Sequence, residues 1–63
     1  MNDKVQRAIR QVNEFWSKQE EGYINWDDVS EDFFKETSKR EMMRKYGFTS
    51  FQYKALKQYM TGN

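Results

Sequence analysis

The feature that most constrains the fold of this sequence is a tight turn at residues 47–49 between two short helices. Thr49 suits a helix N-cap, because its hydroxyl can accept a hydrogen bond from the free backbone N–H of Gln52. The Gln52 side chain can in turn reach the backbone N–H of Thr49, which completes a capping box. Gly47 can adopt the left-handed conformation that ends the preceding helix. One helix is therefore expected to end at this turn and another to begin.

The residues around the turn support the same prediction. Phe48 precedes the cap and Tyr53 follows it by four residues, which is the spacing of a hydrophobic staple. We predict a helix over Lys39–Tyr46 and another over Ser50–Met60. Capping, glycine placement and apolar spacing all indicate the same boundaries, and such agreement between local signals is typical of a well-specified structure.

A longer amphipathic helix is predicted at the start of the chain, from Asp3 to about Glu21. Asn2 or Asp3 can cap its beginning, and Gly22 follows its end as a helix-terminating glycine. Apolar residues recur at spacings of three and four and form the stripe expected to face the core. This stripe consists of Val5, Ala8, Ile9, Val12, Phe15 and Trp16.

A second helix is predicted from Trp26 to about Glu36, with Asn25 as its N-cap. Ser38 and Glu41 form another capping-box pattern, so we expect this helix to be separate from the next. The alternative is one continuous helix as far as Tyr46. We expect the second helix to bury Trp26, Val29, Phe33 and part of Phe34, and to expose Asp27, Asp28, Glu31 and Asp32.

Length and composition exclude several classes of protein. Sixty-three residues predict one domain, residues 1–63, and the chain has no cysteine and no histidine. This excludes disulfides, a thiol nucleophile, an imidazole base and the usual zinc ligands. No catalytic constellation or phosphate-binding glycine loop is present, so we expect no enzyme activity and no cofactor. The acidic residues on one helix supply too few ligands for a metal site.

The predicted fold class is therefore all-α, a small single domain of four short helices. Aromatic residues make up 17% of the chain, and their large side chains can build an adequate core at this size. No apolar run approaches the length of a membrane span or of a signal peptide, so we expect no membrane partner and a cytoplasmic protein.

Charge is distributed unevenly along the chain, although the net charge is only +1. Residues 1–21 are balanced, and residues 22–36 carry a net charge of −4. Residues 37–63 carry six basic residues against Glu41 alone, a net charge of +5. Positive charge in this last segment favours an anionic partner such as nucleic acid, although a solvated helix face can carry the same charge with no partner.

Residues 38–60 resemble the helix-turn-helix motif of DNA-binding proteins. Two short helices flank a turn that contains Gly47, with Phe48 after it and with Tyr53 and Leu56 three residues apart on the inner face of the second helix. Met42, Met43 and Tyr46 continue the apolar pattern in the first helix. The resemblance implies that the helix Ser50–Met60 enters the major groove of duplex DNA.

The same resemblance implies a set of DNA-binding residues. Basic side chains would hold phosphates, and polar side chains early in the last helix would contact base edges or phosphates. Phe51 could touch a thymine methyl group or anchor a protein partner, and the alternative is that it packs back on Met43 or Trp16. The candidates are Lys39, Arg40, Arg44, Lys45, Ser50, Phe51, Gln52, Lys54 and Lys57.

Two function classes follow from the sequence. The leading hypothesis is a small DNA-binding regulator of transcription, with a symmetric homodimer to increase the number of contacts. The alternative is a small protein–protein interaction module, an inhibitor or adaptor that uses the acidic helix start and exposed aromatic side chains. A third option is a structural fragment of a larger assembly.

Overall fold

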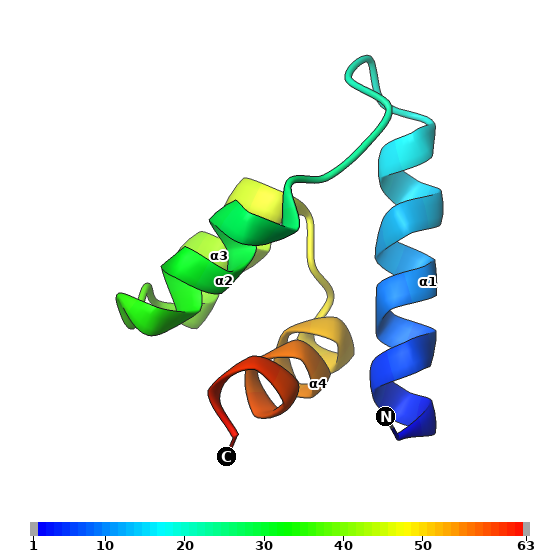
Figure 1. Ribbon diagram of the computed structural model, residues 1–63. Helices are drawn as coiled ribbons and strands as arrows, with labels where there is room; N and C mark the ends of the chain where they lie inside the picture. The colour runs from blue at the N-terminus through cyan, green and yellow to red at the C-terminus, as the bar shows by residue number, and fades with distance from the viewer. Residues whose placement is uncertain (1, 63) are drawn as a thin grey trace.

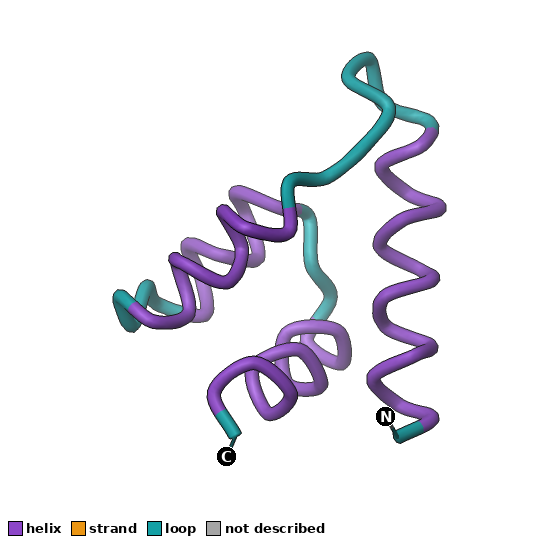
Figure 2. Tube along the Cα trace, viewed as in Figure 1, coloured by secondary structure: helices purple, strands orange, loops and turns teal. Residues whose placement is uncertain are grey.

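The computed structural model describes residues 2–62, which form four helices joined by loops (Figures 1 and 2). These are α1 (Asp3–Ser17), α2 (Trp26–Phe34), α3 (Lys39–Tyr46) and α4 (Ser50–Thr61). The described part of the chain contains no strand, which confirms the all-α prediction. Helices α2 and α3 are separate, as the capping pattern between them predicted. Among residues 2–62, no helix has both the length and the apolar character needed to cross a bilayer.

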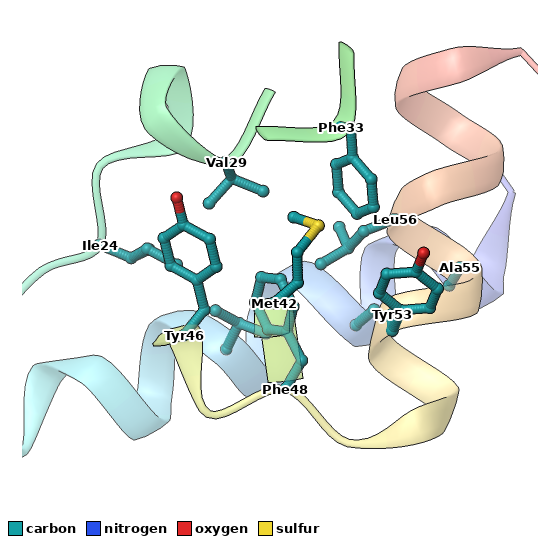
Figure 3. Close-up of a cluster of buried hydrophobic side chains, with 11 residues drawn as sticks. Ile24, Val29, Phe33, Met42, Tyr46, Phe48, Tyr53, Ala55 and Leu56 are labelled. Atoms are coloured by element: carbon teal, nitrogen blue, oxygen red, sulfur yellow. The ribbon is translucent and has the colours of Figure 1, made fainter. Parts of the chain in front are cut away.

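The four helices surround one apolar core, and each contributes a side chain with almost no exposure. These side chains are Val12 from α1, Val29 from α2, Met42 from α3 and Leu56 from α4. Helix α4 packs most extensively against α1 and also contacts α2 and α3. Figure 3 shows several aromatic rings from different segments gathered around Met42. No helix here is long enough to be stable alone in water, so this shared core holds them together.

The turn between α3 and α4 has the predicted geometry. Gly47 is left-handed with φ of 73°, and the Thr49 hydroxyl accepts from the backbone N–H of Gln52 at 3.2 Å. The Gln52 side-chain oxygen accepts from the backbone N–H of Thr49 at 3.0 Å, so the capping box is complete. Phe48 and Tyr53 are both buried. The predicted boundaries of α3 are confirmed, and α4 extends one residue beyond its predicted end, to Thr61.

Helix α1 is shorter than predicted, because it ends at Ser17 rather than near Glu21. Trp16 is the last residue of its apolar stripe, and the next five residues contain no apolar side chain that could pack on the core. Short helices depend on such packing, so another turn would gain little. Gly22 is left-handed with φ of 77°, but it lies within the connection to α2 rather than at the helix end. At the N-terminus, Asn2 is the cap.

Helix α2 also ends earlier than predicted, at Phe34. The backbone N–H of Glu36 donates to the carbonyl of Phe33 at 3.1 Å, and that of Thr37 donates to the carbonyl of Asp32 at 3.0 Å. These two bonds define a Schellman motif, in which glycine usually occupies the left-handed position. Here Glu36 occupies it with φ of 59°. It is the only non-glycine residue with positive φ among residues 2–62.

Two aromatic side chains predicted to belong to the core are exposed. Phe15 retains 49% exposure and Phe34 retains 71%. Phe34 lies about 100° around the helix from Phe33, away from the stripe that Val29 and Phe33 form at a spacing of four residues. Phe15 follows the buried Ala8 by seven residues and so shares its side of α1, but it lies in the last turn of the helix. The prediction of Phe15 as a core residue is therefore wrong, and Phe34 is far more exposed than expected.

Replacing Gly47 should destabilise the fold. Gly47→Val is expected to cost about 1–3 kcal/mol, because a β-branched residue resists the left-handed conformation. A β-carbon there would also lie 3.1 Å from the Phe15 ring. Gly22→Val is the matched control, since Gly22 has a similar φ but open space around it. Chemical denaturation should show a larger loss of stability for Gly47→Val, and equal melting temperatures for Gly47→Val and the parent would contradict the assigned turn.

Replacing Glu36 by glycine should stabilise the protein. Glu36→Gly is expected to raise the free energy of unfolding by about 1 kcal/mol, because glycine adopts the left-handed conformation without the steric cost of a β-carbon. The greater entropy of glycine in the unfolded chain offsets part of this gain. Glu36→Gln is the control, since it removes the charge but keeps the β-carbon. Thermal melts that rank Glu36→Gln at or above Glu36→Gly would show that charge rather than backbone strain sets the effect.

Candidate nucleic-acid interface

One face of α4 is exposed and basic. Ser50, Lys54 and Lys57 recur at spacings of four and three residues, which places them in a line on the side of the helix opposite Gln52 and Leu56. All three are exposed, whereas Gln52 and Leu56 are buried. No aspartate or glutamate occurs anywhere in α4. The outward face of this helix therefore carries only positive charge.

Lys39, at the start of α3, extends this basic face. Its ammonium group donates to the Ser50 hydroxyl at 2.9 Å. The same ammonium nitrogen lies 5.9 Å from the centre of the Tyr53 ring, and the ammonium nitrogen of Lys57 lies at the same distance from it. Two cations therefore flank one aromatic ring. We call Lys39, Ser50, Lys54 and Lys57 the basic stripe.

Two further residues lie beside the basic stripe that the sequence analysis did not select. Lys4 from α1 and Gln58 from α4 line one hollow together with Lys54. Both are exposed. The position of Gln58, four residues after Lys54, could have revealed it as a member of the same helix face. Nothing in the sequence could have placed Lys4, because its position depends on how α1 packs against α4.

The charges of the basic stripe are not neutralised within residues 2–62. The ion pairs in that range join Lys35 to Glu31 at 2.7 Å and Lys45 to Asp32 at 2.9 Å. Lys4, Lys39, Lys54 and Lys57 take part in neither. Uncompensated ammonium groups on one face attract anions, and the phosphates of nucleic acids are one such partner.

Gln52 is not available to contact a base. It is only 8% exposed, and its oxygen completes the cap of α4. Its amide nitrogen donates to the side-chain oxygen of Gln11 at 3.1 Å, which links α4 to α1. Moving Gln52 outward would break both contacts. The prediction of Gln52 as a base-contacting residue is therefore corrected, because the side chain serves the fold.

Phe51 is half-buried and packs against the apolar core. It lines the hollow that also contains Val5, near the beginning of α1. The structure therefore agrees with the alternative in which Phe51 packs back on the domain, although its neighbour at that hollow is Val5. Its remaining exposed surface lies next to Lys54.

The basic residues of α3 other than Lys39 lie apart from the basic stripe. Arg44 and Lys45 line a different hollow, next to Phe15 and Trp16 in the last turn of α1. Arg40 is exposed on α3, one helical turn before Arg44. The nine predicted DNA-binding residues therefore divide into the four of the basic stripe, two that pack into the domain, and three on the other faces of α3.

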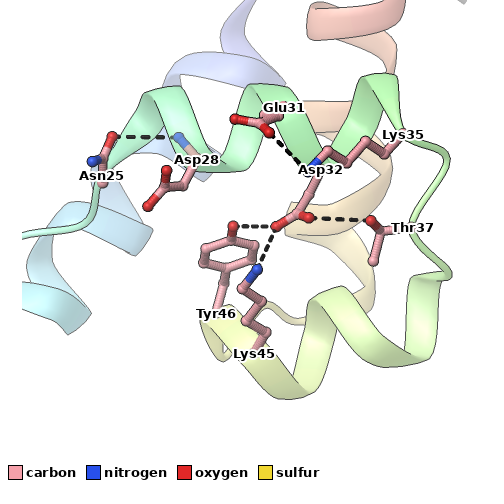
Figure 4. Close-up of polar contacts among 8 residues, drawn as sticks. All are labelled: Asn25, Asp28, Glu31, Asp32, Lys35, Thr37, Lys45 and Tyr46. Atoms are coloured by element: carbon pink, nitrogen blue, oxygen red, sulfur yellow. Dashed lines mark hydrogen bonds and ion pairs between the residues drawn. The ribbon is translucent and has the colours of Figure 1, made fainter.

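Asp32 is another residue whose environment differs from the prediction (Figure 4). It was expected to face solvent, but it is only 9% exposed. Its carboxylate accepts hydrogen bonds from the Tyr46 hydroxyl, from Lys45 at 2.9 Å and from the Thr37 hydroxyl at 3.2 Å. A buried carboxylate requires such partners. These contacts join α2 to α3 and occupy the ammonium group of Lys45.

The contacts around Asp32 also shift the pKa values of Asp32, Tyr46 and Lys45. The hydrogen bond from Tyr46, followed by that from Lys45, lowers the pKa of Asp32 below its ordinary value, and burial opposes this effect. Burial and the nearby carboxylate of Asp32 raise the pKa of the Tyr46 hydroxyl. Asp32 is therefore ionised and Tyr46 neutral at physiological pH. The pKa of Lys45 is raised chiefly by its hydrogen bond to Asp32.

Comparison with protein-family models, with curated proteins and with solved structures finds no match to this chain. The resemblance of residues 38–60 to the helix-turn-helix motif therefore stays a prediction.

The Asp32 contacts predict a specific dependence of stability on pH. Because the pKa of Asp32 is lowered on folding, its contribution to stability is complete above the ordinary value of 3.8 and is lost as the pH falls through the folded-state pKa. Asp32→Asn should be less stable than the parent at neutral pH and should lose less stability below pH 3.8. Asp27→Asn is the matched control, because Asp27 is an exposed residue on the same helix.

The measurement is urea denaturation of the three proteins across this pH range. Asp32→Ala, which leaves the buried Tyr46 hydroxyl without its acceptor, should cost about 1–3 kcal/mol at neutral pH. Parallel pH profiles for Asp32→Asn and the parent would contradict the role assigned to this carboxylate.

Proposed function

We propose that this protein binds duplex DNA through the outward face of α4 and acts as a small regulator of transcription. The observation that supports the proposal is the basic stripe, a line of exposed and uncompensated positive charge on a helix that carries no acidic residue. Phosphate contacts supply most of the affinity of such proteins for DNA.

The dimensions of α4 suit the major groove. Its twelve residues span about 18 Å at a rise of ~1.5 Å per residue. A helix fits within the major groove of B-form DNA, which is about 12 Å wide. The turn at Gly47 and the capping box at Thr49 define how α4 follows α3, so the helix is presented on a well-ordered support. Helix α3 brings Lys39 to the beginning of α4.

Each exposed side chain then has a role that follows from its chemistry. Lys39, Lys54 and Lys57 would contact phosphates, and Lys4 would add a contact from the beginning of α1. Gln58 replaces Gln52 as the candidate that reads a base, because glutamine can form two hydrogen bonds with adenine in the major groove.

The distribution of acidic residues also selects the α4 side for DNA. Exposed Asp27, Asp28 and Glu31 on α2 would repel phosphates that approached that helix. A single domain of this size makes few contacts, so a homodimer that presents two copies of α4 would increase affinity.

The second candidate is the protein-interaction module. Two large aromatic side chains favour it, since Phe34 is 71% exposed and Tyr23 is 69% exposed. Exposed aromatic side chains can act as anchors at protein interfaces. Salt dependence separates the two functions, because each neutralised phosphate steepens the fall of affinity with rising salt, whereas an interface anchored by aromatic side chains depends on salt only modestly.

Paired variants of α4 test the proposal. Lys54→Ala should weaken binding to all duplexes alike and should reduce the slope of log affinity against log salt by about one. Gln58→Ala should cost about 1–3 kcal/mol on a duplex selected from a random pool and much less on a scrambled duplex. Fluorescence anisotropy over a salt series measures both effects.

Two controls accompany these variants. Lys35→Ala removes an exposed lysine that is already paired with Glu31, and it should leave the salt slope unchanged. Gln52→Ala should lower stability by about 1–2 kcal/mol through its lost hydrogen bonds, without the sequence-specific loss expected for Gln58→Ala. Absence of duplex binding by the parent at low salt, where charge is least screened, would refute the proposed function.

A further inference from the structure

A hollow of about 510 Å³ lies where the end of α2, residues 36–38 and residues 53–61 of α4 meet. This volume falls within the range of about 300–1,000 Å³ that is typical of small-molecule sites. Aromatic, cationic and hydroxyl groups all line it. It takes no part in the DNA contacts proposed above, except that Lys57 belongs both to its lining and to the basic stripe.

Three aromatic rings supply the apolar part of the lining. Phe33 and Tyr53 are buried, and their ring centres lie 5.6 Å apart with a tilt of 43° (Figure 3). Phe34 lines the same hollow and remains 71% exposed. A large apolar ring left in water is costly. A flat ligand that covered the Phe34 ring would remove this cost.

Donors for an anion lie around the same hollow. The ammonium nitrogen of Lys57, which lines the hollow, is 5.9 Å from the centre of the Tyr53 ring, and that of Lys39, outside the lining, lies at the same distance from this ring. The Ser38 hydroxyl oxygen accepts from the backbone N–H of Glu41 at 3.2 Å, and its own hydrogen can still be donated to a ligand. The Thr37 hydroxyl hydrogen is already donated to Asp32. Lys57 and the hydroxyls of Ser38 and Tyr53 are thus the side-chain donors in the lining that remain for a ligand.

One acidic residue opposes an anion at this site. Glu36 lines the hollow and carries the left-handed backbone conformation described above. Its carboxylate is exposed, so water screens much of its repulsion. Lys39 lies outside the lining but beside the Tyr53 ring, so it adds a second positive charge close to the hollow. The local balance therefore still favours an anion.

We propose that this hollow binds one unpaired nucleotide. The base would stack on Phe34, and the phosphate would lie between Lys57 and the hydroxyl of Ser38. Aromatic rings beside lysines are the usual means of holding unpaired bases without sequence preference. The ligand chemistry is a planar base joined to a phosphate, and it can come from a free mononucleotide or from an unpaired end of a DNA strand. Only the second source rests on the proposed function.

Nuclear magnetic resonance titration of the whole chain tests the site directly. Adenosine monophosphate should cause saturable shifts at the backbone amides of residues 33–38 and of Lys57. Adenosine alone and inorganic phosphate alone should each bind at least about tenfold more weakly, because each lacks half of the recognised chemistry. Equal affinity for phosphate and for the nucleotide would overturn the proposal, and so would the absence of saturable shifts.

Variants distinguish stacking from non-specific attraction. Phe34→Ala should weaken nucleotide binding at least about tenfold, since base stacking on an aromatic ring supplies much of the affinity. Tyr23→Ala is the matched control, because it removes an equally exposed ring from the connection between α1 and α2. Glu36→Gln should strengthen nucleotide binding about threefold, because it removes a carboxylate that repels the phosphate. Retained affinity in Phe34→Ala, or an equal loss in Tyr23→Ala, would refute the assignment. The same spectra report whether each variant is folded.

A pair of duplexes separates the two sources of the nucleotide and isolates this inference from the proposed function. A duplex with one unpaired 3′ adenosine should bind more tightly than its blunt counterpart, and Phe34→Ala should abolish the difference. Tight blunt binding with no response to the nucleotide or to the unpaired end would overturn the inference and leave the proposed function intact. Nucleotide binding without any duplex binding would support the hollow, assign it to free nucleotides and refute the proposed function.

Discussion

The structure depends on Tyr46, because this one residue connects three helices and the turn. Its hydroxyl donates to Asp32 of α2, and its backbone carbonyl accepts from the indole N–H of Trp16 of α1 at 3.0 Å. Its ring stacks on Phe48, with centres 5.3 Å apart and a tilt of 25°. Helices this short are not stable in isolation, so contacts that join several of them carry much of the cooperativity of the fold.

The contact between Tyr46 and Asp32 also affects which basic residues remain uncompensated. A carboxylate buried at this point needs compensation, and Lys45 provides it at 2.9 Å. Lys45 is therefore paired with Asp32 on the α2 side of α3, and its charge is compensated there. Five basic residues of the C-terminal half have no such partner among residues 2–62, and three of them, Lys39, Lys54 and Lys57, belong to the basic stripe. The other two are Arg40 and Arg44 on α3. A requirement of the core thus shapes the surface on which the proposed function rests.

The basic stripe and the hollow beside α2 share Lys57, and both lie next to Tyr53. This arrangement relates the two proposals physically. A duplex on α4 would bring phosphates to Lys57, and an unpaired end of that duplex would then lie near the exposed ring of Phe34. The strained backbone of Glu36 lies at the same place, and strain of this kind often accompanies functional sites.

The sequence by itself determined the boundaries that depend on neighbouring residues. Thr49, Gly47 and Asn25 act on backbone groups within a few positions, so the turn and the caps could be predicted. Ser38 acts in the same way at the start of α3, so the separation of α2 from α3 could also be predicted. Only the tertiary structure decided the environments of Asp32 and Gln52, because each becomes buried where one helix meets another. Lys4 joins the basic surface for the same reason. Burial and surface charge depend on which helix faces meet, and local chemical pattern does not specify that choice.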